Sequence, residues 1–478
     1  MAPGATHYVS PDSSAPVPPY TNWVAAATNI QDAINAADPG DLVLVTNGVY
    51  QTGGALDSQS MSNRVVLNKP LVVQSINGPA ATTIMGAQGN LRLGIPRVRC
   101  ACLTNGASLV GFTLTNGSAG TVSPSFGGGV YGTFNYPSAP TALVSNCVLT
   151  GNSAYSGGGA YGALLCNCLL VGNSASIGGG ASTCTLNSCI LTGNVASGSG
   201  ATLPPPGFGG GGYFCNMTNC LIVGNSATNG GGACSSRLIN CTIVSNTASF
   251  GGGIFAYETT ALTNCIVFYN SAGTGPNYQP GPSFSHCCTT PLPSGPGNIT
   301  NEPGFLNLTA GDLHLQTNSS CINAGVNSAI AGATDLDGNP RIAGGTVDIG
   351  AYEFESPSSI ISYAWLQQYH LPTDGSADSL DSDGDGMSNW QEWQAGTDPT
   401  DDSSVLRISS ISVAGAVATV RWQSVSGVTY CLERSNDLLA QPSFLPVQSN
   451  IAGIAGTLVC SQTNGTGVGS VFYRLRVQ

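Results

Sequence analysis

A short phrase of alternating polar and apolar residues recurs six times between Asn146 and Asn270. The six copies are NCVLTGN, NCLLVGN, SCILTGN, NCLIVGN, NCTIVSN and NCIVFYN. Their cysteines are Cys147, Cys168, Cys189, Cys220, Cys241 and Cys265, spaced by 21, 21, 31, 21 and 24 residues. In each copy the cysteine and the second aliphatic residue fall on one face, which is the periodicity of a β-strand. A repeat of this length predicts a solenoid of short strands.

Glycine runs follow most copies of the phrase, for example Gly157 to Gly159 and Gly178 to Gly180. Glycine triplets disfavour helix, and glycine and asparagine supply turns because both tolerate positive φ. The pattern therefore predicts a parallel β-helix with one coil per repeat and two or three short strands per coil. Because successive coils lie about 4.8 Å apart, we expect an inward cysteine ladder, an inward Leu/Ile ladder and an asparagine ladder from Asn152 to Asn270.

These phrases resemble the repeats of the pectin-lyase-like superfamily of right-handed parallel β-helices. The pairing of GGG[A/I/V] with [L/I]xxN is also similar to the repeats of chlamydial polymorphic outer-membrane proteins, which serve as adhesins. The run CINAGVN…DIGAYE resembles the closing segment of bacterial surface β-helices of the choice-of-anchor type. The resemblance implies an all-β fold built on a right-handed solenoid. It leaves function open, because this fold hosts lyases, hydrolases, tailspikes and adhesins.

Composition shifts along the chain predict four segments. An amphipathic helix from Asn29 to Asp38 is expected at the N-terminus, because a solenoid needs its first coil covered. At the C-terminus, alternating apolar and polar residues predict a small β-sandwich of five to seven strands, with one disulfide between Cys431 and Cys460. In chain order the predicted segments are a cap (residues 1–50), the parallel β-helix (51–355), a linker with a calcium-binding loop (356–403) and the β-sandwich (404–478).

Only 8% of the 478 residues are charged, and the net charge is −12. A chain this acidic has no basic patch for nucleic acid, and it lacks an apolar run of about 18 residues that would span a membrane. The start MAPGATHYV has neither the basic nor the apolar part of a signal peptide. We interpret the sequence as the mature form of a secreted or cell-surface protein. Most of the 17 cysteines are predicted to be free thiols inside the solenoid.

The sharpest chemical motif is DSDGDGMSNWQE, at residues 381–392. It matches a twelve-residue calcium loop, with carboxylates at positions 1, 3, 5 and 12 and a glycine at position 6. The predicted ligands are Asp381, Asp383, Asp385, Met387 through its backbone carbonyl, Asn389 and Glu392. The continuation NWQEWQAGTDPTD resembles a thrombospondin type 3 repeat, in which Asp398 and Asp401 could join a second ion. We predict Ca²⁺ in a structural role, and the alternative is an acidic linker.

Residues 101–300 contain only two formally charged side chains, Arg237 and Glu258. Each follows a glycine run by five residues, so we expect the two side by side on adjacent coils. One interpretation is a salt bridge in the ladder, and the other is a lyase or hydrolase site with Tyr257 nearby. Hydrolysis by paired carboxylates is disfavoured, because the central coils hold only one. β-Elimination on uronates needs a base, and the first coils offer further candidates: Lys69, Arg92, Arg97 and Arg99.

An aromatic row is expected on the outside of the solenoid, one residue beyond the inward position that follows each glycine run. Its predicted members are Tyr131, Tyr161, Phe214 and Phe255. Aromatic faces at coil spacing suit stacking on sugar rings, and the alternative is local packing under a loop.

The outward positions of the repeated phrase form an apolar stripe, with Thr242 as its one polar member. The apolar members are Val148, Leu169, Ile190, Leu221 and Ile266. An exposed stripe of this length normally marks a contact surface, and the terminal sandwich, a loop or a partner could cover it. A group of charged residues follows later in the chain, and we interpret it as a charged cluster that closes the last coil, with a catalytic or metal-binding role as the alternative. Its members are Asp335, Asp337, Arg341, Asp348 and Glu353.

Three function classes follow from these features. The first is a secreted or surface β-helix that binds polysaccharide or a cell-surface partner through its aromatic and apolar rows. The second is a polysaccharide lyase or, with less support, a glycosidase. The third is a structural surface protein that self-associates through the apolar stripe. Low charge and the absence of paired carboxylates in the central coils favour binding, whereas the enzymes of this fold and the few clustered basic residues favour catalysis.

Overall fold

The computed structural model describes residues 4–89, 96–120, 125–133, 141–198, 207–439, 441–463 and 470–478. The chain divides into two compact units. The first comprises Met1–Gln316, Ala324–Ala343 and Val347–Glu355. The second comprises Thr317–Asn323, Gly344–Thr346 and Ser356–Gln478.

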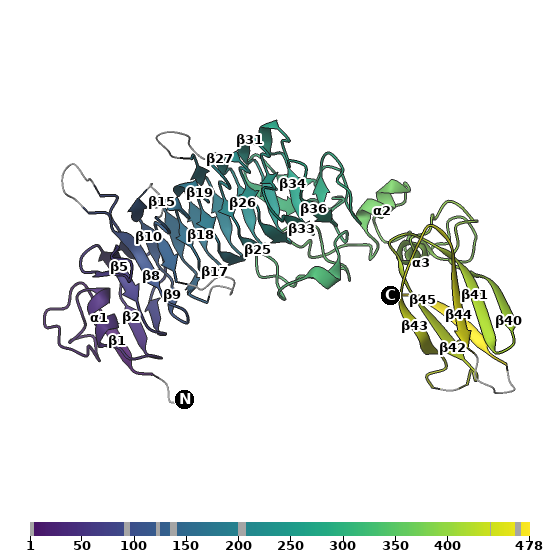
Figure 1. Cartoon of the computed structure of the whole chain (residues 1–478), viewed down its shortest axis with the longest axis horizontal. Helices are drawn as coiled ribbons and strands as arrows, with labels where there is room; N and C mark the ends of the chain where they lie inside the picture. The colour runs from purple at the N-terminus through teal and green to yellow at the C-terminus, as the bar shows by residue number, and fades with distance from the viewer. Residues whose placement is uncertain are drawn as a thin grey trace. The chain divides into compact units, whose positions relative to one another are not determined.

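The first unit is a right-handed parallel β-helix whose complete coils carry four short strands each (Figure 1). We name the four sheets of the β-helix A, B, C and D, and their strands are given below. Along one coil the chain passes through sheets A, B, D and C and then returns to sheet A. The sequence predicted two or three strands per coil. The additional strand arises because the residues on both sides of each glycine run pair with the next coil, so that the run is a corner between two strands.

Each sheet is built from one strand of every coil that contributes to it, except that sheet C also contains β4, which pairs antiparallel with β5. Sheet A comprises β1 (Thr6–Val9), β2 (Leu42–Val45), β6 (Val72–Ser75), β9 (Ser108–Val110), β13 (Leu143–Ser145), β17 (Leu164–Cys166), β21 (Thr185–Asn187), β25 (Asn216–Thr218), β29 (Arg237–Ile239), β33 (Ala261–Thr263) and β36 (Ser283–Ser285). Sheet B comprises β3 (Gly48–Tyr50), β7 (Thr82–Met85), β10 (Thr113–Thr115), β14 (Val148–Thr150), β18 (Leu169–Val171), β22 (Ile190–Thr192), β26 (Leu221–Val223), β30 (Thr242–Val244), β34 (Ile266–Phe268) and β37 (Cys288–Thr289).

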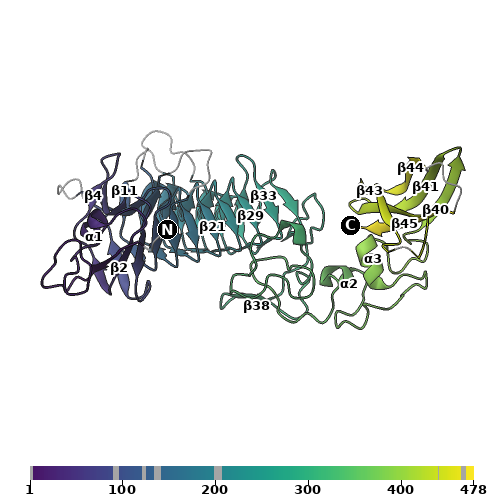
Figure 2. The same ribbon diagram turned by 90° about the horizontal axis from the view of Figure 1, so that it is seen from below.

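The other two sheets flank the glycine corners. Sheet C comprises β4 (Ala55–Leu56), β5 (Ser62–Leu67), β8 (Arg99–Leu103), β12 (Val130–Gly132), β16 (Ala160–Tyr161), β20 (Ala181–Ser182), β24 (Gly212–Tyr213), β28 (Ala233–Cys234) and β32 (Ile254–Phe255). Sheet D comprises β11 (Ser118–Gly120), β15 (Ser153–Ser156), β19 (Ser174–Ile177), β23 (Val195–Ala196), β27 (Ser226–Asn229), β31 (Thr247–Phe250) and β35 (Ser271–Thr274). The strands stack as regular rows, and a segment carrying β38 (Phe305–Asn307) and β39 (Asp312–Leu315) lies beside the last coils (Figure 2).

The N-terminal segment covers the first coil. Helix α1 spans Ile30–Ala36, with the side chain of Asn29 capping it by accepting a hydrogen bond from the Asp32 backbone N–H at 3.0 Å. Its buried face includes Ile30, Ala33 and Ile34, as the amphipathic pattern predicted. The helix is shorter at both ends than the predicted range. Strand β1 pairs in parallel with β2, so the N-terminal segment is continuous with the solenoid.

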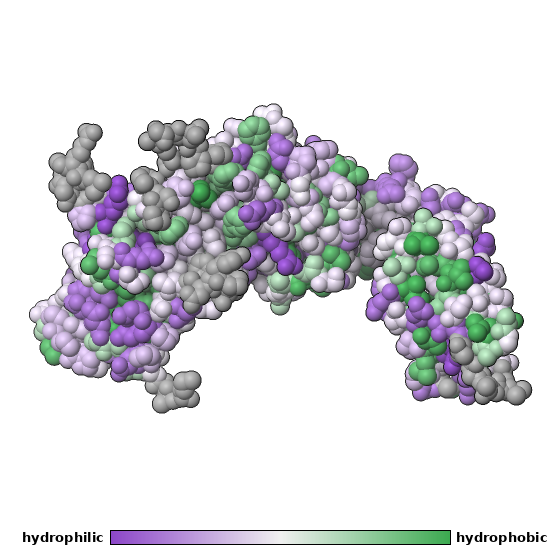
Figure 3. All heavy atoms as spheres, in the orientation of Figure 1, coloured by the Kyte–Doolittle hydropathy of each residue, from purple (hydrophilic) through white to green (hydrophobic). Residues whose placement is uncertain are grey.

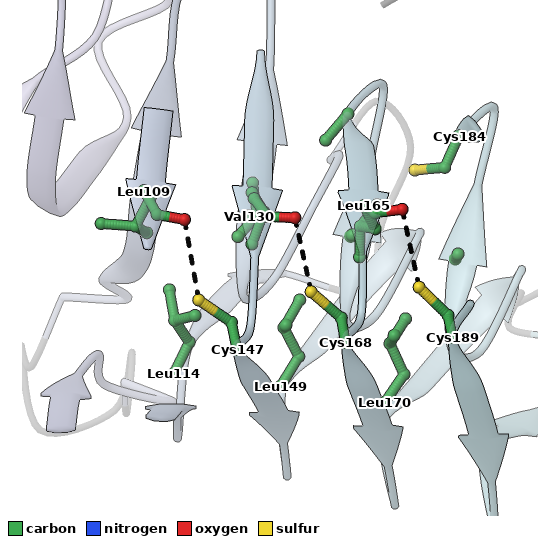
Figure 4. Packing of buried hydrophobic residues seen from close by; sticks show 14 of the residues in the cluster. Leu109, Leu114, Val130, Cys147, Leu149, Leu165, Cys168, Leu170, Cys184 and Cys189 are labelled. Atoms are coloured by element: carbon green, nitrogen blue, oxygen red, sulfur yellow. Dashed lines mark hydrogen bonds between the residues drawn. The ribbon is translucent and has the colours of Figure 1, made fainter. Parts of the chain in front are cut away.

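Cysteine and aliphatic ladders form the interior of the coils, as predicted. The six repeat cysteines are at most 3% exposed. Each thiol donates to a backbone carbonyl, as Cys147 does to Leu109 at 3.7 Å and Cys168 to Val144 at 3.4 Å. The aliphatic ladder beside them is fully buried (Figure 4): Leu149, Leu170, Leu191, Ile222, Ile243 and Val267. Equivalent residues stay in register although the spacing of the repeats varies, because the extra residues lie in the connections between strands.

The asparagine ladder is continuous through the repeats. In each step the side-chain amide of one asparagine donates to the Oδ1 atom of the next, for example from Asn152 to Asn173 at 3.0 Å. The same Oδ1 atom also accepts the backbone N–H of the preceding ladder residue. The ladder extends beyond the predicted end, because Asn270 donates to Asn277 at 3.3 Å. These buried amides are therefore satisfied by one another.

A second column of residues turns the chain from sheet A into sheet B with positive φ, and Asn146 (φ 50°) and Asn167 (φ 52°) belong to it. In the degenerate copy GFTLTNG, Gly111 occupies this turn with φ 79°. Thr113 pairs with Val148, so Phe112 takes the inward cysteine position.

The second unit contains two short helices and two antiparallel sheets. Helices α2 (Tyr363–Gln368) and α3 (Asn389–Ala395) lie near a small core of Ile361, Leu366 and Ala377. The sheets have the orders β40-β41-β44 and β43-β42-β45. Their strands are β40 (Ile408–Ala414), β41 (Val417–Ser424), β42 (Thr429–Ser435), β43 (Leu445–Ala452), β44 (Gly456–Thr463) and β45 (Phe472–Val477).

All 17 cysteines are free thiols, and every one except Cys166 is buried. The predicted disulfide between Cys431 and Cys460 is therefore wrong. The two residues lie in different sheets of the second unit, where Cys431 approaches Ser449 at 3.4 Å and Cys460 donates to Gln448 at 2.9 Å. None of the helices in the described ranges has the length and apolar character that crossing a bilayer requires.

Candidate functional site

Aromatic side chains line up along the outer face of sheet C. The inward neighbours of this column, such as Val130, Ala160 and Ile254, are fully buried, so the alternate positions face outward. The strand register gives the column as Tyr131, Tyr161, Ser182, Tyr213, Cys234 and Phe255. The rings of Tyr131 and Tyr161 are stacked, with centroids 5.9 Å apart. We call Tyr131, Tyr161, Tyr213 and Phe255, all of them half-buried, the aromatic row.

Phe214 does not belong to the aromatic row, contrary to the sequence prediction. The glycine run before it has four members, and the fourth, Gly212, takes the inward position, where Met217 fills the space beside it. Tyr213 therefore faces outward in register with Ser182 and Cys234. Phe214 is the turn residue after the strand, with φ 50°. The prediction failed by one residue because it counted from the end of the glycine run.

Two further phenylalanines join the row and were missed by the sequence interpretation. Phe126 lies 4.6 Å from Tyr161 between ring centroids. Phe208 lies 6.3 Å from Phe255 and 5.5 Å from Tyr257. Both residues immediately precede a glycine run, in PSFGGG and PGFGGG. That position could have been recognised, because it is the last residue before the corner between sheets D and C.

Arg99 anchors the N-terminal end of the row. Its guanidinium donates to Asp57 at 2.8 Å, to Asn63 at 2.7 Å and to the backbone carbonyl of Gly127 at 2.6 Å. The side chain is buried, and its Cζ atom lies 4.8 Å from the ring centroid of Tyr131. The Arg99 guanidinium thus ties the β4–β5 hairpin, through Asp57 and Asn63, to the segment before β12, through the Gly127 carbonyl.

A small cleft opens beside Arg99. Its volume is about 330 Å³. It is lined by Gln59, Ser60, Met61, Arg99, Ala119, Ser125 and Phe126. Because Phe126 and Arg99 contribute to both features, the cleft continues the surface of the aromatic row toward the N-terminal coils.

The other basic candidates are not among the residues that line this cleft. Lys69 donates to the backbone carbonyl of Ala37 at the end of α1, which is a capping role. Arg97 lies next to Gly89 and Gly120. Arg92 lies outside the described residues. Within the described part of the chain, Lys69 and Arg97 thus belong to different surroundings and form no common site.

Arg237 and Glu258 do not stack, which corrects the sequence prediction. Arg237 is in register with Ala261, not with Glu258. The connection from sheet C to sheet A has two residues before β29 but five before β33, and Glu258 lies in this longer turn. No ion pair links the two among the described residues. Tyr257, 65% exposed, packs instead toward Phe208 at the C-terminal end of the aromatic row.

The apolar stripe of sheet B is covered over its C-terminal half by a loop of the same chain. We call residues 324–343 and 347–355 the closing segment. Its Ala351 backbone N–H donates to the Thr242 hydroxyl at 3.0 Å. Thr242 and Ile266 are each 1% exposed and Leu221 7%, whereas Val148, Leu169 and Ile190 are only half-buried. Only the N-terminal half of the stripe is therefore an open surface.

The charged cluster lies inside the closing segment, against the side of the solenoid. Arg341 donates to the carbonyls of Ala351 and Gly350 at 2.9 and 2.8 Å. Glu353 accepts backbone N–H groups from Ala343 and Asp348, each at 3.1 Å. Burial, followed by the charge of Asp348, raises the pKa of Glu353 to about 8. These hydrogen bonds hold the closing segment together where it lies over sheet B. The prediction that the charged cluster closes the last coil is therefore wrong.

An exposed histidine cluster, which sequence reasoning missed, lies at the edge of the closing segment. His314 contacts Asp312 and Asp337, each at 2.6 Å. Burial lowers the pKa of His314, but the hydrogen bonds to Asp337 and Asp312 outweigh it and the net shift is upward. The ring of Tyr352 lies 4.2 Å from the imidazole. Asp312 and His314 both lie on β39, whereas Asp337 belongs to the closing segment, so the spacing of the residues along the sequence did not reveal the complete cluster.

The predicted calcium ligands converge in the second unit. Carboxylate oxygens of Asp381, Asp383 and Asp385 lie within 4.8 Å of one another. Glu392, on α3, is fully buried, yet both of its carboxylate oxygens lack a hydrogen-bond partner. One oxygen each of Asp383 and Asp385 is buried and unpartnered as well. Burial, then the charges of Asp383, Asp385 and Asp381, raises the pKa of Glu392 to about 7.

The capped start of α3 brings Glu392 to this loop. The hydroxyl of Ser388 accepts the Gln391 backbone N–H, and Gln391 returns a bond to the Ser388 N–H, which completes a capping box. The Nδ2 atom of Asn389 donates to the Ala377 carbonyl at 2.8 Å, and its Oδ1 atom is buried without a hydrogen-bond partner. Asp398 and Asp401, expected at a second ion, bond instead to Thr400 and Ser403. Among the described residues, one carboxylate cluster of metal-binding geometry is present.

Comparisons with known proteins bear on both units. Residues 381–402 match the family model of the bacterial TSP3 repeat. Among solved structures, the chain is similar to the pectate lyase Pel9A, with a TM-score of 0.43 and 16% identity over 73% of this chain and 96% of that one. It is also similar to a rhamnogalacturonan lyase, with a TM-score of 0.27 and 16% identity over 61% of this chain and 65% of that one. No curated protein matches the chain.

Proposed function

We propose that the chain is a secreted or cell-surface protein that binds polysaccharide along the aromatic row of sheet C. The observation that supports this proposal is the row itself, in which four of six successive coils place a half-buried ring in one column, with the buried Ser182 and Cys234 at the other two positions. Aromatic rings with polar tips offer a large rigid contact area at low entropic cost. Sugar units carry apolar C–H faces beside hydroxyl groups, so a polymer of such units complements a row that repeats with the coils.

The charge of the solenoid favours a neutral polymer. Residues 101–300 carry two formally charged side chains, Arg237 and Glu258. Arg99, which lies just before this range at the N-terminal end of the row, is already paired with Asp57. A polyuronate bound here would lack compensating cations, and burying its carboxylates unpaired would cost free energy. On the face that Figure 3 shows, strongly hydrophilic residues gather over the N-terminal coils, and pale, green and purple surface is mixed over the middle coils.

A catalytic function has less support. Arg237 and Glu258 do not stack, and Lys69 and Arg97 lie in different surroundings. Hydrolysis by two carboxylates would need a second acidic side chain in the central coils, where the sequence has only Glu258. The alternative function, a lyase, would use a basic residue of the first coils as the base for β-elimination, and the experiment below tests it.

Incubation of the full chain with neutral and acidic polysaccharides tests the proposal. Retardation in gels containing each polymer would measure binding, while absorbance of unsaturated uronates and new reducing ends would measure β-elimination and hydrolysis. We expect retardation by a neutral polymer without product. Failure of every polymer to retard the chain would refute polysaccharide binding, and accumulation of unsaturated product would move the function to the lyase alternative.

A second proposal concerns the loop in the second unit, which we infer holds Ca²⁺. The ligands would be Asp381, Asp383, Asp385 and Glu392, with the backbone carbonyl of Met387. The supporting observation is the orphaned, buried carboxylate of Glu392 beside unpartnered oxygens of Asp383 and Asp385. Hard oxygen donors at this spacing suit Ca²⁺, and a bound dication would offset the repulsion among the carboxylates. Its role would be to fix α3 against the loop.

A further inference from the structure

The closing segment docks on sheet B by bonding its backbone to asparagines of the solenoid. Asn264 accepts the Val326 backbone N–H at 2.9 Å and donates to the Val326 carbonyl at 3.1 Å. Asn219 donates to the Thr334 carbonyl at 2.8 Å. Val326 is extended, with φ −121° and ψ 119°. An extended backbone thus lies against the column of residues that turn sheet A into sheet B.

The same column continues beyond the closing segment, toward the N-terminal coils. Asn167 and Asn146 occupy the equivalent turn positions, with nearly the same φ as Asn219 and Asn264. Their side chains are exposed. The apolar stripe continues beside them through Val148, Leu169 and Ile190, which are half-buried. The apolar position is therefore repeated on three coils, and the turn asparagine on two of them, because the third has Ser188 at the turn.

A cleft of about 470 Å³ marks the boundary between the covered and uncovered coils. Leu169 and Ile190 contribute apolar walls, and Asn167 and Ser188 contribute polar atoms. The other wall is the edge of the closing segment, lined by Thr334, Asp335, Leu336, Asp337, Gly338 and Tyr352. The cleft is thus amphipathic, as sites for peptide side chains commonly are.

The cleft carries negative charge. Asp335 and Asp337 line it, and the lining residues include no lysine or arginine. The imidazole of His314 contacts both Asp337 and Asp312. It therefore supplies at most one positive charge against two carboxylates. Burial, followed by the charges of Asp337, Asp312 and Asp335, raises the pKa of Tyr352 to about 12. A basic group is the charge that complements this edge.

We propose that the outer face of sheet B over β14, β18 and β22 docks an extended polypeptide segment of a partner protein. The backbone of that segment would bond to Asn146 and Asn167, as the closing segment bonds to Asn219 and Asn264. An apolar side chain would pack on Leu169 and Ile190, and a Lys or Arg side chain would meet Asp337. The inference rests on continuity with the chain's own docked segment and is independent of the aromatic row on sheet C.

Selection of random linear peptides on the immobilised full chain tests this proposal. We expect enriched peptides that pair a basic residue with an aliphatic one. Their affinity should fall about tenfold in Asn167→Ala, which removes one hydrogen bond, and by at least as much in Asp337→Asn. Asn216→Ala and Glu258→Gln, at exposed positions on other faces, should leave the affinity unchanged. Equal unfolding midpoints would show that the variants are folded.

Three results would overturn the proposal. The first is no enrichment, or enriched peptides that bind Asn167→Ala and Asp337→Asn as tightly as the wild type. The second is a dimer in light scattering that Leu169→Glu dissociates, which would assign the face to a second copy of the chain. The third is loss of polysaccharide retardation in Leu169→Glu, which would assign it to glycan.

Discussion

The side-chain amide of Asn194 donates to Oδ1 of Asn225 at 2.9 Å, although 31 residues separate them, and the equivalent bond from Asn152 to Asn173 spans 21 residues. The extra residues therefore leave the ladder unchanged. Asn194 also accepts the backbone N–H and the side-chain amide of Asn173, each at 3.0 Å. One buried side chain thus satisfies polar groups on the coils before and after it.

Replacing Asn194 by alanine should destabilise the β-helix strongly. The substitution removes the acceptor of the Asn173 backbone N–H and side-chain amide, and it removes the donor to the Leu170 carbonyl. Oδ1 of Asn225 keeps the backbone N–H of residue 194 as a donor. Each buried polar group left without a partner costs about 1–3 kcal/mol. We expect a loss of about 3 kcal/mol or more in the free energy of unfolding. Urea unfolding of the full chain measures it, with exposed Asn216→Ala as the control. Similar midpoints for the two variants would contradict the structural role of the ladder.

Thiol chemistry tests the interior of the solenoid. All 17 cysteines are free and 16 of them are buried, leaving Cys166 as the partly exposed one. We expect an aromatic disulfide reagent to label Cys166 alone in the native protein and all 17 thiols after unfolding without reductant. Replacing Cys166 by serine should abolish the native reaction. A count after unfolding that falls short by two would indicate a disulfide that the structure lacks.

Glu353 should make the folding stability of the first unit depend on pH. Its pKa is raised to about 8 in the folded chain, from an unfolded value of about 4.3. Between these values the folded state binds more protons than the unfolded state, so stability should fall as pH rises through this window. Glu353→Gln should flatten the decline.

His314, whose pKa is also raised, contributes a decline of the same sign. That contribution should survive in Glu353→Gln and disappear in His314→Gln. Thermal unfolding from pH 5 to 8 measures both. A wild-type slope that persists unchanged in Glu353→Gln would refute the role of Glu353.

Calcium should stabilise the second unit. A ligand at a hundredfold excess over its Kd adds about 2.7 kcal/mol to the folded state. Calorimetry with added Ca²⁺ and with EDTA should show this difference in the wild type and not in Glu392→Gln. Asp401→Asn, outside the carboxylate cluster, should respond as the wild type does. An identical melting curve with Ca²⁺ and EDTA would contradict the inferred ion.

The repeats were predictable because identical residues stack when the coils are in register. The cysteine, aliphatic and asparagine ladders follow from the spacing of Cys147 and its equivalents alone. Errors arose where coil length varies. Because the glycine run at Gly209 to Gly212 has a fourth member, Tyr213 and not Phe214 belongs to the aromatic row. Because the turn before β33 is longer than the turn before β29, Glu258 does not lie beside Arg237. The closing segment could not be predicted, because its contact with Thr242 joins residues 109 positions apart and leaves no periodic signal.

The polysaccharide affinity of the Tyr161→Ala/Tyr213→Ala variant tests the central claim most directly. Calorimetric titration with the neutral polymer that retards the wild type would compare it with Tyr269→Ala, which removes an exposed ring outside the row. Loss of two aromatic contacts at about 1 kcal/mol each predicts at least tenfold weaker binding for the double variant. The affinity of the control should equal that of the wild type. Equal affinities for the wild type and the double variant would contradict polysaccharide binding along the aromatic row.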